Sequence, residues 1–357
     1  AADTPEKRRG VGIAWGGFNV TEGGGDSAEV ALELMPGNKI RKYDTWHAMG
    51  QGATTGSLVV TLEALKEMHL TPEDIQLIQN DTKTCPDTGM AGPSRSLYMD
   101  GNATIIAANK LLAAMRKEDG TLRTYDEMKA EGIETKYLGR YETNTTPGLC
   151  RLDPNTGIGD PTPAFTYCLN LAEVEVDTKT GKTTVLKFTC VDFVGRIGNI
   201  DAVNGQAYSG IMHGIGFALK EDYADVKKHA NMFGAGTSYI KDVPDDINLI
   251  HIDGAISDGP FGSSGASEAF QASGHCAVLN GIYNACGVRI HEIPALPEKV
   301  KAGLDAIAKG EKPYEPKKYF LGSDMYEELE NIKENPVQVG TQSFYVSLDD
   351  PTAERPF

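Results

Sequence analysis

The sequence predicts an α+β protein in which mixed β-hairpins and helices form two similar lobes. Residues 29–46 alternate between apolar and polar side chains around a Pro-Gly-Asn turn, and residues 171–191 alternate around the polar turn 177–182. Elsewhere the apolar period lengthens to that of a helix, as at 58–70. Hairpins mixed with amphipathic helices are typical of the α+β class.

The individual elements follow from the same periods and from the residues that interrupt them. Gly interrupts the first strand, Thr71-Pro72 ends the first helix and Gly120 ends the second. In order, we expect a strand at 11–20, strands at 29–35 and 39–46, a helix at 58–70, a strand from 75, a helix through 105–115, a polar loop or insertion at 120–165, strands at 171–176 and 183–191, a Gly-rich helix at 205–222, a strand at 247–252, a loop at 253–267, and helices at 274–286 and 296–309.

The composition changes near residue 311, and this sets the predicted boundaries. We expect a first lobe at 1–165, a second lobe at 166–310 and a C-terminal extension at 311–357. The extension holds three prolines and one acidic helix at 323–335, but no other periodicity. It is therefore predicted to be an arm that lies on a partner, not a domain.

Charge and cysteine content exclude several classes of protein. The 357 residues carry a net charge of −16, from 34 Lys and Arg against 50 Asp and Glu, which argues against binding to nucleic acid or to an anionic membrane. No apolar run approaches the ~20 residues of a membrane span. Six scattered cysteines with no C-x-x-C pair are neither a disulfide scaffold nor an iron–sulfur or zinc motif. We therefore expect a cytoplasmic protein with reduced thiols.

The first segment that could carry chemistry runs from residue 46 to residue 57. Its glycines lead from a strand end into a helix N-terminus, where free N–H groups and the helix dipole favour anions. Its candidate contacts are Met49, Gly50, Gln51 and Gly52. On spacing alone, the simpler interpretation of a β-to-α turn that needs Gly and a Ser/Thr cap is favoured.

A second segment, 87–96, places small residues and hydroxyls ahead of the next helix. This too can form an anion cradle, and Arg95 can pair with a phosphate. The alternative is a capped helix start with a solvated Arg. The candidate contacts are Gly92, Pro93, Ser94, Arg95 and Ser96.

The third and fourth segments lie in the second lobe. The Gly-rich helix that begins with Gly205-Gln206 carries His213, which is either a ligand donor or an ordinary interior histidine. The small-residue loop 258–267 ends at Ser267-Glu268, with Ser264 inside it. A carboxylate in an apolar setting can act as a general base. The alternative is a helix start in which Ser267 is the cap and Glu268 interacts with the dipole. No H-E-x-x-H or clustered histidines are present, so we expect no protein ligands to a metal.

Taken together and in order, these segments resemble the molybdenum hydroxylases of the xanthine oxidase family. The resemblance covers residues 8–303, and among bacterial members it is strongest to the Desulfovibrio-type aldehyde oxidoreductases. It matches the second half of their molybdenum-binding region. It rests on the stretches Gly50-Gln51-Gly52-Ala53, Gly101-Asn102-Ala103, 227–236, 258–262, 287–290 and 294–300.

The resemblance implies a fold, a cofactor and a reaction. The fold is a molybdopterin-binding half-domain, and the cofactor is molybdopterin, as the cytosine dinucleotide in bacteria, with molybdenum. Glu268 matches the family's catalytic glutamate, which takes the proton from Mo–OH as the oxygen attacks the substrate and hydride passes to the sulfido ligand. The product oxygen comes from water, and an aldehyde becomes a carboxylic acid.

The same resemblance assigns cofactor contacts and marks departures from the family pattern. The expected contacts are Met49, Gly50, Gln51, Gly52, Gly92, Pro93, Ser94, Arg95, Ser96, Gln206, His213, Ser264 and Ser267. His213 stands where the family usually has Gln, Ser267 where Gly is common, and Pro93 where a small residue is usual. These departures put the identity of the substrate in doubt.

The first half of the family's molybdenum region and its iron–sulfur domains are not found in this sequence. The resemblance therefore implies partners: a polypeptide that carries the first half, a [2Fe–2S] subunit and a flavin subunit, beside the small-molecule substrate. Two alternatives stay open. One is hydroxylation of an N-heterocycle such as a purine or nicotinate, and the other is a scaffold subunit without catalysis.

Overall fold

The computed structural model describes residues 4–21, 25–79, 81–92, 94–143, 153, 157, 159 and 161–311. The chain divides into two compact units, 1–313 and 314–357. The second unit, with the predicted acidic helix at 323–335, lies outside the described residues, so the predicted arm stays a prediction. No helix of the described chain is long and apolar enough to cross a bilayer.

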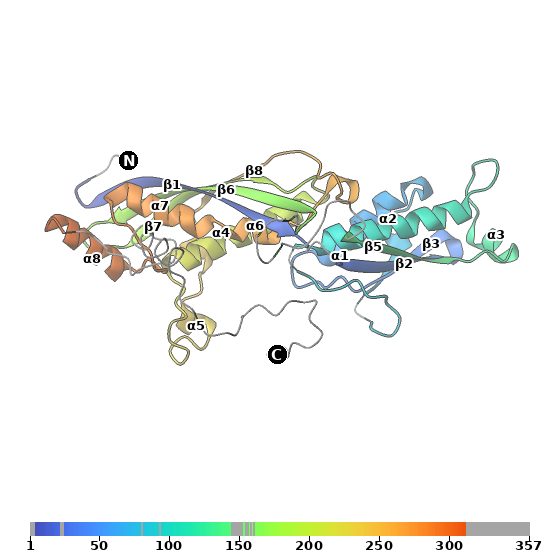
Figure 1. The fold of residues 1–357 in the computed structure, drawn as a ribbon, viewed down its shortest axis with the longest axis horizontal. Coiled ribbons are helices and arrows are strands. Elements are labelled where there is room, and N and C mark those ends of the chain that lie inside the picture. The colour runs from blue at the N-terminus through green and yellow to red at the C-terminus, as the bar shows by residue number, and fades with distance from the viewer. Residues whose placement is uncertain are drawn as a thin grey trace. The chain divides into compact units, whose positions relative to one another are not determined.

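The described chain forms two four-stranded sheets with helices packed on them, which confirms the predicted α+β class (Figure 1). The strands are β1 (Lys7–Val20), β2 (Ser27–Met35), β3 (Lys39–Asp44), β4 (Ile75–Gln79), β5 (Lys136–Glu142), β6 (Ala164–Asp177), β7 (Thr183–Phe193) and β8 (Asp246–His251). The helices are α1 (Ala53–Ala64), α2 (Ser96–Met115), α3 (Tyr125–Ala130), α4 (Ile200–Leu219), α5 (Met232–Ala235), α6 (Ser267–Gln271), α7 (Gly274–Cys286) and α8 (Pro297–Ala308).

Sheet 1 has the strand order β1-β6-β7-β8, and α7 packs against β1 and β6. Two glycines of β1 allow this helix to approach closely. A Cβ on Gly10 would lie 2.3 Å from the carbonyl oxygen of Gly281, and one on Gly12 would lie 2.0 Å from that of Ala277. The hydrophobic core of this lobe lies between sheet 1 and its helices, and Phe188 is fully buried in it.

Sheet 2 has the strand order β4-β3-β2-β5, with β3 and β4 parallel and the other pairs antiparallel. Helix α2 packs along β2 and β5, and α1 packs on α2. A buried ion cluster ties this lobe together, because Nζ of Lys42 lies 2.7 Å from Asp100 and 3.3 Å from Asp44. All three side chains are inaccessible to water.

Two sequence predictions differ from the structure. Residues 1–165 were assigned to one lobe, but β1 pairs with β6 along its whole length and so belongs to sheet 1. Residues 120–165 were assigned to a loop or insertion, but they contain α3 and β5. Helix α3 begins with a capping box, because Thr124 and Glu127 bond reciprocally to each other's backbone amides. Residues 144–152, with Cys150, lie outside the described residues.

Small residues join the two lobes near the end of sheet 1. The short turn η6 (Pro260–Gly262) packs on α2, where a Cβ on Gly101 would lie 2.5 Å from the ring of Pro260. A shared cluster of buried side chains includes Val20 and Ile256 together with Tyr98 and Met99 of α2. This contact brings the loop before α6 next to the segment before α2.

Candidate active site

A pocket of about 530 Å³ lies where five segments of the two lobes meet. Its walls come from the turn before α1, the segment before α2, the loop between β7 and α4, the first turns of α4, and the loop before α6. The lining includes Trp46, Met49, Gln51, Gly52, Ala53, Gly92, Ser94, Arg95, Ser96, Arg196, Gly198, Asn199, Gln206, Phe261, Ser263, Ser264, Gly265, Ser267 and Glu268. All four segments predicted from the sequence therefore contribute to one cavity.

Glu268 is half-buried at this pocket and is held by a residue of the other lobe. The backbone amide of Ser94 donates to Oε1 of Glu268 at 3.2 Å, and the Ser94 hydroxyl donates to Oε2. Both carboxylate oxygens therefore have a partner in the segment before α2. The remaining lone pairs are free to accept a proton from a molecule in the pocket.

The position of Glu268 depends on glycines that let backbones touch. A Cβ on Gly265 would lie 1.9 Å from the carbonyl oxygen of Ser94, so only Gly fits there. Helix α6, which carries Glu268, lies against α4 at Gly210, where a Cβ would come within 2.6 Å of Phe270. Two interior glycines of α4, Gly210 and Gly214, are therefore explained by close packing against α6 and α7.

Arg95 does not serve as the predicted phosphate contact, although it lines the pocket. Its Nε and Nη2 donate to the two carboxylate oxygens of Asp26 at 2.7 and 2.8 Å. Its other N–H groups donate to the carbonyl oxygens of Ser27, Thr88 and Met90. All five donors of the guanidinium are used, and the side chain is buried. Arg95 instead holds the segment before α2 in place.

Most of the other predicted contacts line the pocket, but two described residues, Gly50 and His213, do not. Gly50 is not part of the lining, although its neighbours Met49 and Gln51 are. His213 lies two turns beyond Gln206 along α4, with its ring centroid 6.3 Å from that of Phe217, and does not line the pocket. Pro93 lies outside the described residues.

The side chain of Gln51 holds the turn before α1 in shape. Gln51 accepts from the amide of Met49 at 2.5 Å and donates to the carbonyl oxygen of His47 at 2.6 Å. Gly52, with φ of 87°, is the N-cap of α1, and no side chain caps this helix. The first amides of α1 therefore face the pocket without a side-chain acceptor.

The sequence analysis missed the loop between β7 and α4. Its residues Gly195-Arg196-Ile197-Gly198-Asn199 carry a recognisable signal: a Gly-flanked cation after a strand, followed by an Asn that caps the next helix. Arg196 is exposed on the pocket wall, and its guanidinium has no hydrogen bond or ion pair with the described residues. It is therefore available to an anionic ligand.

These features fit a phosphate-bearing ligand such as a pterin cofactor. Helices α1 and α2 both begin at the pocket without a side-chain cap, and Arg196 adds a positive charge. The hydroxyl of Ser264 is buried at the pocket and has no partner among the described residues. Nowhere in the described ranges do three His, Cys, Asp or Glu side chains gather to hold a metal directly.

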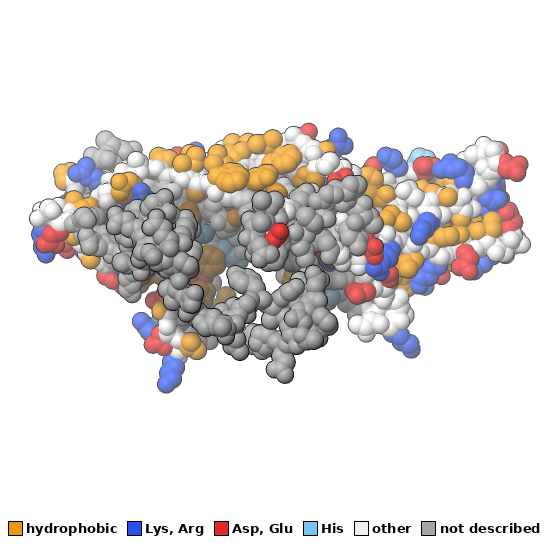
Figure 2. Space-filling model, in the orientation of Figure 1, with side chains coloured by type: hydrophobic (Ala, Val, Ile, Leu, Met, Phe, Trp, Pro, Cys, Tyr) orange, Lys and Arg blue, Asp and Glu red, His pale blue; other side chains and the backbone are white. Residues whose placement is uncertain are grey.

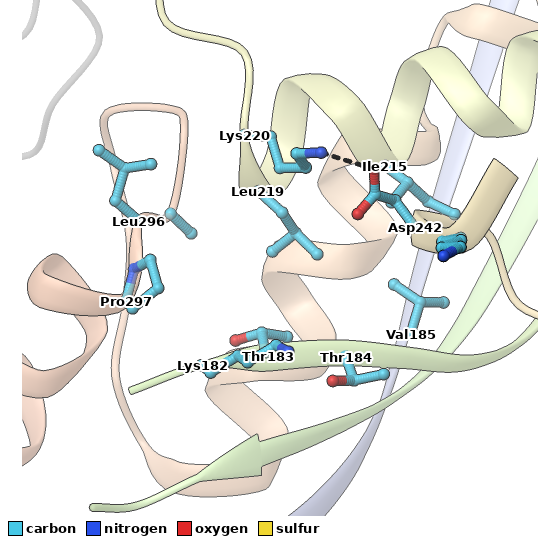
Figure 3. Close-up of a pocket in the computed structure, with 12 residues that line it drawn as sticks. Lys182, Thr183, Thr184, Val185, Ile215, Leu219, Lys220, Asp242, Leu296 and Pro297 are labelled. Carbon is cyan, nitrogen blue, oxygen red and sulfur yellow. Dashed lines mark hydrogen bonds and ion pairs between the residues drawn. The ribbon is translucent and has the colours of Figure 1, made fainter. Parts of the chain in front are cut away.

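A second pocket, of about 440 Å³, lies at the other end of α4 (Figure 3). Lys182 and Thr183 of the β6–β7 turn region, Leu219 and Lys220 of α4, and the 295–297 loop line it. Its carboxylate, Asp242, is paired with Lys220 at 2.5 Å. Nothing in it offers a base comparable to Glu268.

Comparison with known proteins identifies the class to which this fold and pocket belong. The molybdopterin cofactor-binding domain model matches residues 1–244. An aldehyde oxidoreductase of Megalodesulfovibrio gigas is 40% identical over 303 residues, which are 85% of this chain and 33% of that protein. The crystal structure of the aldehyde oxidoreductase from Desulfovibrio desulfuricans superposes with a TM-score of 0.80 at 43% identity, covering 84% of this chain and 32% of that one.

The chain therefore belongs to the molybdopterin cofactor-binding domains, within the molybdenum oxidoreductases of the xanthine oxidase family. A more distant relative, the gamma subunit of a 6-hydroxypseudooxynicotine dehydrogenase complex from Paenarthrobacter nicotinovorans, is 23% identical over 333 residues, 85% of this chain and 41% of that protein. The chain spans about a third of the length of the aldehyde oxidoreductases that it matches.

Proposed function

We propose that this chain supplies the catalytic base and one wall of the cofactor site in a molybdenum hydroxylase that oxidises aldehydes to carboxylic acids. The observation that carries the proposal is the Glu268 carboxylate, which lines the pocket and is held by the backbone amide and the hydroxyl of Ser94. The match to aldehyde oxidoreductases over 85% of the chain supports the choice of substrate class.

The pocket would hold the pterin cofactor through backbone amides and one cation. The uncapped starts of α1 and α2 offer N–H groups, Gly52 and Gly92 allow close approach of the ligand, and Arg196 meets its phosphates. When bound, the cofactor supplies a molybdenum centre that transfers oxygen from water to the substrate and accepts two electrons.

The chain's own task in the reaction is to take and release a proton. Glu268 would accept the proton at a carboxylate oxygen that faces the pocket, while Ser94 keeps the carboxylate in one orientation. Phe261 and the small residues 263–266 enclose this position, which limits the access of water.

Replacement of the base tests this proposal. Glu268→Gln keeps the shape of the side chain but removes the proton acceptor, so turnover of the molybdenum-loaded protein should fall by about 10²–10⁴-fold. Molybdenum content should stay unchanged, and Glu298→Gln on the exposed start of α8 is the control. Unchanged turnover in a loaded Glu268→Gln protein would show that the base is wrongly assigned.

The substrate, the electron route and the dinucleotide are part of the same proposal. We infer electron transfer to iron–sulfur clusters, and to flavin, on partner chains or domains, and a cytosine dinucleotide form of the cofactor. A relative that is one subunit of a complex supports this division. The five described cysteines are free, which supports a cytoplasmic site of action.

A panel of aldehydes, purines and nicotinate, assayed by dye reduction, decides between oxidation of aldehydes and oxidation of N-heterocycles. Nucleotide analysis of the extracted cofactor identifies its dinucleotide form.

A further inference from the structure

One face of sheet 1 is apolar although no described element covers it. Strand registers place Trp15, Leu169, Val191 and Ile250 opposite one another in a single row across all four strands. Neighbouring side chains on this face extend the row. We call the whole set the apolar face: Val11, Ile13, Trp15, Phe165, Tyr167, Leu169, Leu171, Val191, Ile250 and Ile252.

Six of the ten side chains of the apolar face are exposed to water, and the other four are partly exposed. Trp15 is 66% exposed, and Val11, Ile13, Phe165, Ile250 and Ile252 are each between 43 and 54% exposed. Tyr167 stacks between Trp15 and Phe165, with ring centroids 5.5 and 6.3 Å away, so the aromatic part is preformed. Figure 2 shows hydrophobic side chains gathered along this sheet.

The apolar face cannot be explained as the ordinary solvated side of a sheet. A sheet with one solvated face alternates between apolar and polar residues, whereas the part of sheet 1 that carries these ten residues is apolar on its outer face as well as on its inner face, as in sheets that are covered on both sides. Sheet 2 of the same chain shows the ordinary pattern. There Glu29 pairs with Arg140 at 2.8 Å and Glu33 lies 4.0 Å from Arg41 on the outer face.

The apolar face also has a position that points to one occupant. It occupies the end of sheet 1 from which β7 and β8 lead into the loops 194–199 and 253–266, both of which line the pocket. At the other end, Glu175 pairs with Lys7 and Arg9, and the face becomes charged. A protein domain bound to the apolar face would therefore lie beside the pocket.

We propose that the apolar face is the docking surface for the part of the molybdenum region that this chain lacks. This inference rests on the proposed function. The chain spans about a third of its aldehyde oxidoreductase relatives, so surfaces that their remaining residues cover are exposed when this chain is considered alone. Aromatic and aliphatic residues in one preformed patch are the usual centre of such an interface.

Hydroxyl-radical footprinting of the natively purified protein tests the docking surface, with peptide mass spectrometry at Trp15. If the face is covered, labelling of Trp15 should fall about tenfold below its value in the unfolded protein, as expected for a desolvated interface residue. Trp46, which is 6% exposed, gives the reference for a covered tryptophan. Phe233, which is 84% exposed, gives the reference for an open side chain.

A pair of variants adds a second readout. The Trp15→Glu protein should no longer copurify with the missing part of the molybdenum region. The Leu138→Glu protein, which is changed at a half-exposed apolar residue on the outer face of sheet 2, should still copurify with it.

The outcomes separate the docking surface from the proposed function. Ready labelling of Trp15 in a molybdenum-loaded preparation would overturn the docking surface and leave the function standing. Protection of Trp15 in a preparation that contains only copies of this chain would also overturn it, because the occupant would be a second copy. Protection by the first half of the molybdenum region in a preparation without molybdenum would retain the docking surface and refute the function, whereas protection by an unrelated polypeptide would overturn the docking surface.

Discussion

Ser94 binds both carboxylate oxygens of Glu268, one through its amide at 3.2 Å and the other through its hydroxyl. The two residues are 174 positions apart and belong to different lobes. The contact exists because Gly265 allows the loop before α6 to touch the Ser94 backbone. The orientation of the proposed base therefore depends on how the two lobes meet.

Removal of the Ser94 hydroxyl should weaken catalysis without removing the base. In Ser94→Ala the amide bond to Glu268 remains but Oε2 loses its donor, so we expect turnover to fall about tenfold. The measurement is steady-state kinetics on preparations of equal molybdenum content. If the hydroxyl acts through Glu268, Ser94→Ala should cost nothing further in a Glu268→Gln background. Equal losses in both backgrounds would contradict this.

Replacement by Ala should have opposite effects on the free energy of unfolding at two glycines of α4. A Cβ at Gly210 would lie 2.6 Å from Phe270, so Gly210→Ala should displace α6 and lower both stability and turnover. Nothing lies within 4 Å of a Cβ at Gly205, so Gly205→Ala should raise the free energy of unfolding by about 0.5–1 kcal/mol. Denaturant titration checks both, and equal effects would refute the packing argument.

Arg95 should contribute to stability and not to recognition of a phosphate. Arg95→Met removes the ion-pair partner of Asp26 and the guanidinium donors to three carbonyl groups, so it should lower the free energy of unfolding by about 3–5 kcal/mol. Arg196→Met should leave stability unchanged and reduce the molybdenum content. Normal stability in Arg95→Met, with only the cofactor lost, would restore the original prediction of a phosphate contact.

The buried cluster in sheet 2 should make stability depend on pH. Burial raises the pKa of Asp100 from 3.8 to about 6, the charge of Asp44 adds to the rise, and Lys42 opposes it. The folded protein therefore binds this proton more tightly than the unfolded chain does. The stabilisation is fully present below about pH 4 and is lost as the pH rises through about 6.

The stability difference between the wild type and Asp100→Asn should accordingly fall, by on the order of 2 kcal/mol, between pH 4 and pH 7. Denaturant titrations of both proteins across this range isolate the contribution of Asp100 from those of other carboxylates. A constant difference would mean that Asp100 is ionised throughout, with Lys42 dominating its environment.

Local periodicity predicted the elements well but could not assign all of them to lobes. The hairpins around Pro36 and around residues 177–182 and the helices at 274–286 and 296–309 appear close to the expected bounds. The pairing of β1 with β6 was missed because it joins residues about 150 positions apart, which no local pattern reports. Strand β5 was missed because it is short and partly exposed within a polar stretch.

The candidate site was predicted better by residue type than by role. Glu268, Ser94 and Gln206 meet at one pocket as expected. Arg95 was misassigned because a sequence cannot show that Asp26 and three carbonyl groups use all of its donors. Arg196 was overlooked although Gly195 and Gly198 mark its loop, because no single motif covers that pattern.

The molybdenum content of the natively purified protein, measured by elemental mass spectrometry, tests the central claim most directly. A chain that forms part of a molybdopterin site should carry about one molybdenum atom, since one cofactor occupies one pocket. Arg196→Met should lower this value. A folded protein, purified together with its partners and free of molybdenum, would contradict the account.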